Sequence, residues 1–287
     1  MSPLDILWFY FILSSLQPVI QQRIMTARRI SALRTLEKKN KSRVITMIHR
    51  RETLAILGIP FGGFIDIDDS EEVIRAIEMT SNDIPIELVL HTPGGLVLAA
   101  EQIASALANH PAPVTVYIPH YAMSGGTLIS LAADRIVMSP SAVLGPVDPQ
   151  LGNFPAASIL WAVEQKDKNE VRDQTLIMAD MSRKAIKQVE EIVTKLVSAR
   201  VGEQRGRELG RTMTEGRWTH DFPIDAELAT SFGLPVDTNL PDEVREMMRL
   251  YPQPRGRRPS VEYIPAPYGG DQERRRKSGG WGGRNPS

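Results

Sequence analysis

Residues 86–96 read IELVLHTPGGL, an apolar run of strand length that ends in a turn with one proline and two glycines. Residues 121–127 read YAMSGGT and place a second glycine pair after another apolar run, with Ser124 directly before it. A helix-like interval follows each turn. Because glycine has no Cβ, the backbone at such a turn can approach a ligand closely. The two turns therefore indicate one site built at the ends of two strands.

The chain around these turns alternates strand-like and helix-like segments. Three apolar, β-branched runs predict strands, at residues 44–48, 86–90 and 114–118. Three helix-like intervals separate or follow them, at residues 71–79, 97–109 and 125–133. Strands that alternate with helices in this way form parallel β/α crossover units, and their ligands lie beyond the carboxyl ends of the strands. We therefore expect an α/β fold in which both turns lie at the ligand-binding edge.

The residue types in the two turns suit attack on a carbonyl group. Such chemistry needs a hydroxyl on a tight turn and backbone N–H groups aimed at the oxygen that becomes negative. Ser124 supplies the hydroxyl, and Gly94, Gly95 and Gly125 are the candidate N–H donors of an oxyanion hole. The Gly-x-Ser-x-Gly elbow of α/β-hydrolases is absent, because Ala122 stands two residues before the serine.

Three stretches together resemble the serine dehydrogenase proteinase family, which comprises Clp-fold serine peptidases related to signal peptide peptidase A. They are residues 86–96, 121–127 and 144–150, the last reading LGPVDPQ, and the resemblance extends over roughly residues 20–240. It implies a Clp/crotonase-like spiral of β/α units and a serine endopeptidase. Two alternatives share the fold: a crotonase-like acyl-CoA enzyme and a catalytically silent membrane scaffold.

The resemblance leaves the base open. Clp-type peptidases use a histidine that follows the serine, but this chain has no histidine between His120 and His220. Signal peptide peptidase A and its relatives use a lysine, which serves as a base once burial lowers its pKa. Apolar positions 159, 160 and 163 predict that Lys166 faces inward, so we expect a Ser124–Lys166 dyad. Lys184, on the polar side of a later helix, and His120 are the alternative bases.

The N-terminus suggests attachment to a membrane. Residues 1–22 contain an apolar run of about fifteen residues, or about 23 Å as a helix against a hydrocarbon core of about 30 Å. Residues 23–43 form a basic helical linker, and this flank places the catalytic domain on the cytoplasmic side by the positive-inside rule. We expect a single membrane-anchor helix in contact with lipid. An amphipathic or oligomer-forming helix is the alternative.

Composition limits the partners. Thirty-four basic residues balance thirty-four acidic ones, so we expect no nucleic acid. The chain has no cysteine, and no histidine cluster with zinc-ligand spacing occurs, so we expect no metal and no cofactor. Residues 44–250 are the expected peptidase domain, acting on a peptide or membrane-protein substrate. A long amphipathic helix at 174–200 predicts a homo-oligomer. Residues 251–287, rich in proline, glycine and arginine, are the expected disordered tail.

Overall fold

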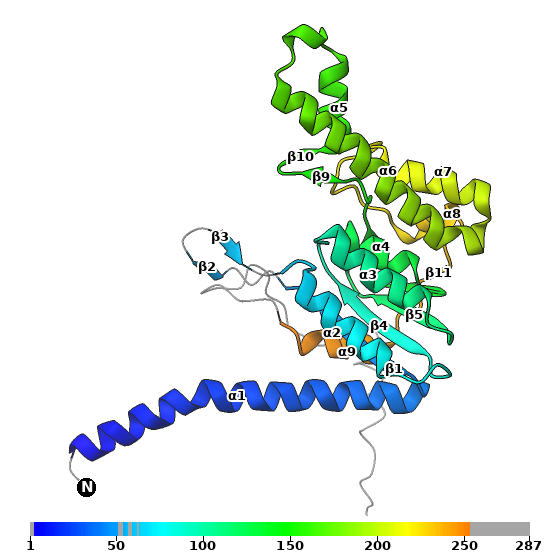
Figure 1. Cartoon of the computed structure of the whole chain (residues 1–287). Coiled ribbons are helices and arrows are strands. Elements are labelled where there is room, and N and C mark those ends of the chain that lie inside the picture. The colour runs from blue at the N-terminus through cyan, green and yellow to red at the C-terminus, as the bar shows by residue number, and fades with distance from the viewer. Residues whose placement is uncertain (1–2, 51–53, 57–58, 62, 253–287) are drawn as a thin grey trace, which may run out of the picture. The chain divides into compact units, whose positions relative to one another are not determined.

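The computed structural model describes residues 3–50, 54–56, 59–61 and 63–252. A parallel five-stranded sheet forms its centre (Figure 1). Its strands lie in the order β1 (Arg43–Ile48), β4 (Ile86–His91), β5 (Val114–Ile118), β7 (Arg135–Met138) and β11 (Val236–Asp237). Every neighbouring pair runs parallel. The expectation of an α/β fold built on a parallel sheet is confirmed.

Three helices connect successive strands and cover one face of the sheet. They are α2 (Ile67–Glu78), α3 (Val97–Ala108) and α4 (Gly125–Leu131), each preceding the next parallel strand as the alternating pattern predicts. The main hydrophobic core lies between these helices and the sheet. All six residues of β4 are buried, because strands flank it on both sides and helices cover both of its faces. The glycine turn that follows β4 is therefore attached to a strand that is held in place on all sides.

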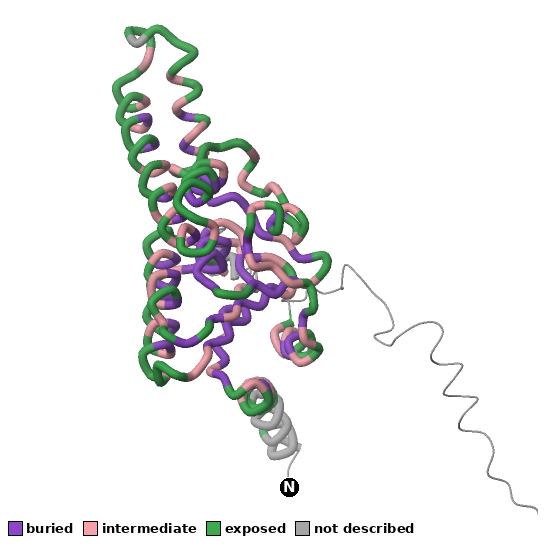
Figure 2. The backbone as a smooth tube through the Cα atoms, turned by 90° about the vertical axis from the view of Figure 1, so that its right-hand side faces the viewer, coloured by how far each residue is buried: buried purple, intermediate pink, exposed green. Residues whose placement is uncertain are grey.

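Two terminal helices cover the opposite face. The carboxyl half of α1 (Pro3–Asn40) and α9 (Asp242–Arg249) pack there in a second, smaller core that includes Leu36, Val89 and Val244. A buried carboxylate at Glu87 is satisfied on this side, because it accepts hydrogen bonds from the Asn40 amide at 2.8 Å and the Tyr117 hydroxyl at 3.2 Å. In Figure 2 the buried residues concentrate in the sheet and on the helix faces that turn toward it.

The N-terminal helix differs from the expectation. Residues 3–40 form one continuous helix, where the sequence suggested an apolar anchor in 1–22 and a separate linker in 23–43. The helix continues through Pro18. Among the residues that the structure describes, no helix is both long enough and apolar enough to cross a bilayer. The expected transmembrane helix is therefore not found.

The part that follows β7 is mainly helical. Its helices are α5 (Ala156–Glu164), the 3-10 helix η1 (Lys168–Glu170), α6 (Asp173–Val201), α7 (Glu203–Thr214) and α8 (Ala226–Ser231). The long helix α6 matches the amphipathic helix expected at 174–200. α5 and the first turns of α6 form a hairpin beyond the sheet (Figure 1). The helical C-terminal part is thus confirmed.

Three two-stranded pairs complete the description. β2 (Leu54–Ile56) pairs with β3 (Ile59–Phe61), and β9 (Gln150–Leu151) pairs with β10 (Phe154–Pro155), both antiparallel. β6 (Tyr121–Ala122) pairs in parallel with β8 (Val143–Leu144) next to the second glycine turn. The expected disordered tail, 251–287, lies outside the described residues from 253 onward.

Candidate active site

The two glycine turns lie against each other at the carboxyl ends of β4 and β5. Thr92 N–H donates to the Tyr121 carbonyl at 3.2 Å, and Met123 N–H donates to the Thr92 carbonyl at 3.0 Å. Gly94 has a φ of +105°, and a Cβ added to it would lie 2.8 Å from Ser124 Cβ. Only glycine permits this approach. The structure thus brings Gly94 and Ser124 together, although thirty residues separate them in the sequence.

Ser124 has a strained backbone. Its φ of 50° and ψ of −115° place a non-glycine residue outside the regions that side chains normally allow. It is the N-cap of α4, yet its side chain makes no capping hydrogen bond. The residue is partly exposed. A strained serine whose hydroxyl caps nothing is what a nucleophile on a tight turn requires.

The N–H groups of the two turns differ in what they donate to. Gly94 N–H donates to Thr92 Oγ1 at 3.2 Å. Within the described residues, the N–H groups of Gly95 and Gly125 donate no hydrogen bond, and a Cβ on Gly125 would lie 3.5 Å from Gly95 N. Of the three glycines expected to line an oxyanion hole, Gly95 and Gly125 therefore have an N–H without an acceptor in the described part of the chain.

The two candidate lysines are exposed. Lys166 follows the end of α5 at the hairpin, and its side chain does not face inward. The apolar spacing that suggested an inward position fails because nothing in the described residues covers this end of α5, where Trp161 is 64% exposed. Lys184 lies on α6, is 70% exposed and pairs with Asp180 at 2.6 Å. Neither amine is desolvated in this arrangement of the chain.

The histidines beside the turns differ in burial. His120 is exposed and stacks on His91, with ring centroids 5.8 Å apart. His91 is completely buried, and its Nδ1 has no hydrogen-bond partner in the described part of the chain. Burial, together with the positive charge of Arg50 and the neighbouring histidines, lowers the pKa of His91 to about 4. At neutral pH His91 is therefore an uncharged imidazole and a weak base.

A carboxylate–histidine pair near the second turn was not anticipated from the sequence. Asp148 is only 3% exposed and accepts a hydrogen bond from His220 Nδ1 at 2.8 Å, while Gln150 Nε2 donates to its other oxygen at 2.7 Å. The hydrogen bond with Asp148 raises the pKa of His220 against the opposing effect of burial. A Cβ on Gly145, three residues before Asp148, would lie 2.5 Å from Met123 Cε. The segment that carries Asp148 thus packs beside the serine turn.

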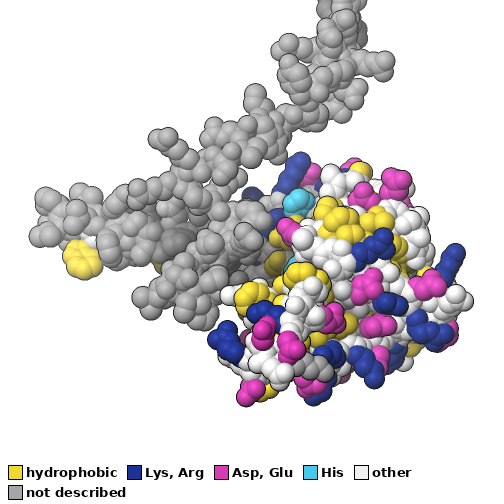
Figure 3. Space-filling view, turned by 90° about the horizontal axis from the view of Figure 1, so that it is seen from above, with side chains coloured by type: hydrophobic (Ala, Val, Ile, Leu, Met, Phe, Trp, Pro, Cys, Tyr) yellow, Lys and Arg dark blue, Asp and Glu magenta, His cyan; other side chains and the backbone are white. Residues whose placement is uncertain are grey.

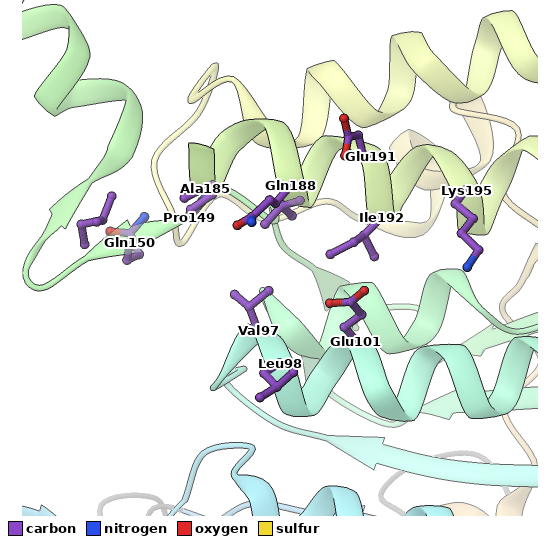
Figure 4. A pocket seen from close by; sticks show the side chains of 12 residues that line it. Val97, Leu98, Glu101, Pro149, Gln150, Ala185, Gln188, Glu191, Ile192 and Lys195 are labelled. Atoms are coloured by element: carbon purple, nitrogen blue, oxygen red, sulfur yellow. The ribbon is translucent and has the colours of Figure 1, made fainter. Parts of the chain in front are cut away.

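A groove of about 630 Å³ begins next to the first glycine turn (Figure 4). Val97 and Leu98, the first residues of α3 after that turn, form one wall, and Gln188 and Ile192 of α6 face them. Gln150 of β9 closes one end. The lining is mainly apolar, so the groove suits a ligand with apolar side chains close to the turns.

A serine in a strained turn beside backbone N–H groups without an acceptor among the described residues is the arrangement expected of an enzyme that attacks carbonyl groups through a serine. The model of one family, ClpP-like SDH-type serine proteinase, matches residues 1–278. The chain belongs to this family, and its identification from the three quoted stretches is confirmed.

Several known proteins are similar to this chain. Uncharacterized protein MJ0137 of Methanocaldococcus jannaschii is 55% identical over 262 residues, which cover 91% of each chain. Membrane protein NfeD1b of Bacillus subtilis is 38% identical over 104 residues, or 33% of this chain and 24% of that protein. Among solved structures, ClpP1 from Listeria monocytogenes is 17% identical with a TM-score of 0.46, over 73% of this chain and 99% of that one.

Proposed function

We propose that this protein is a serine endopeptidase in which Ser124 is the nucleophile. The Ser124 hydroxyl attacks the carbonyl carbon of a peptide bond, and the N–H groups of Gly95 and Gly125 bind the oxygen that becomes negative. The base that takes the hydroxyl proton returns it to the leaving amine, and water then releases the acyl group. The observation that carries this proposal is the strained Ser124 beside two N–H groups that donate to no other described residue.

Lys166 is the proposed base, and its exposure sets a condition on that role. A solvated lysine has a pKa of about 10.4 and is protonated at neutral pH, so it accepts no proton until it is desolvated. Packing of the α5–α6 hairpin against another surface supplies the desolvation, and the same packing has to bring the amine of Lys166 within hydrogen-bond reach of a Ser124 hydroxyl. Burial of this hairpin is therefore part of the proposed mechanism.

Self-association is the proposed source of that burial. Trp161, Ile177 and Met181 on the hairpin are at least half exposed, at 64%, 61% and 50%. Seen from the hairpin side, hydrophobic side chains form patches among the charged ones (Figure 3). Apolar side chains gathered on a helical hairpin favour packing against a second copy. We therefore expect a homo-oligomer, and gel filtration with light scattering at several concentrations measures it.

Attachment to a membrane surface through α1 is a further part of the proposal. Leu16, Ile20 and Ile24 are exposed and recur at four-residue intervals, which places them along one side of the helix. The basic residues that follow complement anionic lipid, as in helices that lie in the membrane interface.

Binding to vesicles of anionic lipid tests this attachment. We expect the full-length protein to sediment with the vesicles, and the pair Leu16→Glu and Ile20→Glu to remain in the supernatant. Gln17→Glu with Gln21→Glu is the matched control, because it adds the same charge on the same helix without removing apolar side chains. If both double variants remain bound to the vesicles, or if the parent protein never binds them, α1 does not contact lipid. If the oligomer dissociates in the Leu16→Glu and Ile20→Glu variant, α1 contributes to self-association instead.

Hydrolysis of an unfolded protein such as casein tests the enzyme proposal. Ser124→Ala should lower the rate by about a thousandfold or more. Lys166→Ala should do the same, while Lys184→Ala, which removes another exposed lysine, leaves the rate unchanged. If His220→Ala abolishes hydrolysis and Lys166→Ala does not, the base is the Asp148–His220 pair.

Calorimetric binding of an acyl-CoA without hydrolysis would favour the acyl-CoA enzyme, and oligomers without either activity would favour the scaffold.

A further inference from the structure

Side chains from three separate elements meet beside the glycine turn that follows β4. His49 comes directly after β1, Asp69 lies in the first turn of α2, and Thr92 begins the turn. His49 Nδ1 lies 2.8 Å from Thr92 Oγ1, and His49 Nε2 lies 3.1 Å from Asp69 Oδ2. Thr92 is completely buried, and the imidazole is only 13% exposed. The imidazole therefore bridges helix α2 and the turn.

The acceptors around His49 determine where its proton lies. Burial alone would raise the pKa of Asp69, but hydrogen bonds from His49 and Asp66 outweigh it and lower the pKa below its usual value. Asp69 is therefore a carboxylate, which only accepts hydrogen bonds, so His49 Nε2 carries a proton. In a neutral imidazole Nδ1 then accepts. The hydroxyl of Thr92 has one proton and two acceptors within reach, and His49 Nδ1 at 2.8 Å is nearer than the Gly94 carbonyl at 3.4 Å, so the hydroxyl donates to His49.

The hydroxyl of Thr92 connects His49 to the backbone of the glycine turn. Its oxygen accepts the N–H of Gly94 at 3.2 Å, a local turn in which a hydroxyl binds the backbone two residues ahead. With the hydroxyl proton directed to His49, a lone pair remains for Gly94 N–H. Gly94 is thereby held at a φ of +105°, and the N–H of the next residue, Gly95, stays available.

We infer that His49 and Asp69 are positioning residues of this site, which hold the oxyanion turn through Thr92. The inference rests on the proposed function, because an oxyanion turn matters only if Ser124 attacks a carbonyl. It assigns a role in catalysis to two side chains that reach the N–H of Gly94 only through Thr92. The alternative role for these contacts is purely structural, as a pin between α2 and β1.

Kinetics of casein-derived peptide hydrolysis separate the two roles. Thr92→Val keeps the shape of the side chain but removes the hydroxyl, and we expect kcat to fall about ten- to a hundredfold with KM nearly unchanged. His49→Ala should give a similar fall. Thr92→Ser keeps the hydroxyl, and His49→Gln keeps one acceptor and one donor at a comparable separation, so both should recover most of kcat.

Asp66→Ala is the matched structural control. It removes the capping partner of Asp69 in α2, where Asp69 N–H donates to Asp66 Oδ1 at 3.0 Å, and leaves the contacts of His49 in place. We expect this variant to melt at a lower temperature with kcat unchanged. If Asp66→Ala and His49→Ala lower the melting temperature equally and neither changes kcat, the contacts only pin α2 and the inference is wrong.

Nitrogen-15 NMR of histidine-labelled protein tests the inference without a measurement of hydrolysis. We expect His49 to show a protonated Nε2 and an unprotonated Nδ1, and Thr92→Val to speed hydrogen exchange at the amide of Gly94. The opposite tautomer would overturn the relay even in an active enzyme. A correct tautomer in a protein without Ser124-dependent hydrolysis would instead overturn the proposed function and, with it, the catalytic role of His49.

Discussion

Replacing Ser124 by glycine should stabilise the fold while removing the nucleophile. The serine has a φ of 50° and a ψ of −115°, a conformation that costs a non-glycine residue about 1–3 kcal/mol. Glycine adopts it without this strain, but its greater freedom in the unfolded chain costs about 0.5–1 kcal/mol. The difference is a net gain of about 0–2.5 kcal/mol in the free energy of unfolding. For a chain of this size each kcal/mol raises Tm by roughly 2–4 °C.

Urea unfolding followed by circular dichroism measures this gain, with Ser124→Ala as the control. Both variants lose the hydroxyl, but alanine retains its Cβ and therefore the backbone strain. We expect Ser124→Gly to unfold at a higher urea concentration than the parent and Ser124→Ala to unfold at or below the parent's midpoint. If glycine and alanine give the same midpoint, the strain at Ser124 is absent and the account of the serine turn is wrong.

Three further predictions concern the surroundings of the site. Gly95→Ala places a Cβ 2.2 Å from the carbonyl oxygen of Ile65, a backbone atom that cannot rotate away, so thermal melting should show a large loss of stability and a hydrolysis assay a loss of activity. The pKa of His91 is about 4 in the folded protein and 6.5 when unperturbed, so the unfolded state binds more protons between these values. The free energy of unfolding should therefore fall by about 3 kcal/mol as the pH drops through this window. Urea titrations at several pH values measure this fall, and His91→Asn should remove most of it. If the free energy of unfolding depends on pH in the same way in His91→Asn, His91 is not the group responsible. His220 has a raised pKa because of its hydrogen bond with Asp148, so Asp148→Asn should lower the pKa found by an NMR titration of His220, and the same pKa in both proteins would refute this cause.

Three strands of the sheet and both turns could be predicted because their signals are local, whereas the short strands β7 and β11 were not predicted. Each of the three predicted strands is a short run of apolar and β-branched residues, as expected of a strand that is buried on both faces. Each turn contains glycines directly after such a run. β1, β4 and β5 begin and end within one residue of the runs at 44–48, 86–90 and 114–118. Pairing of the turns followed from a general rule, since the carboxyl ends of parallel strands share one edge.

The base could not be settled from periodicity. The apolar residues of α5 predicted an inward Lys166, yet the hairpin packs along only part of its surface, and Trp161 in the same helix is 64% exposed. Amphipathic spacing identifies an apolar face but not what covers it. For a hairpin that extends beyond the sheet, the local sequence does not tell which surface packs against its apolar face.

Contacts between distant residues also escaped sequence analysis. Asp148 and His220 are 72 residues apart and meet only because the segment around Ile224 pairs with Leu144. His49 and Asp69 likewise meet across the end of a strand and the start of a helix. Although Asp148 lies in one of the three quoted stretches, no local pattern links it to His220, or His49 to Asp69. Their chemistry arises from tertiary packing, which no short spacing encodes.

The central claim is that Ser124 is the nucleophile, and covalent labelling tests it most directly. The full-length protein is incubated with a fluorophosphonate, which reacts with activated serines, digested, and mapped by mass spectrometry. The account predicts a single adduct on the peptide that carries Ser124, its loss in Ser124→Ala, and slower labelling in Lys166→Ala. An adduct on another serine together with unchanged hydrolysis by Ser124→Ala would contradict the claim.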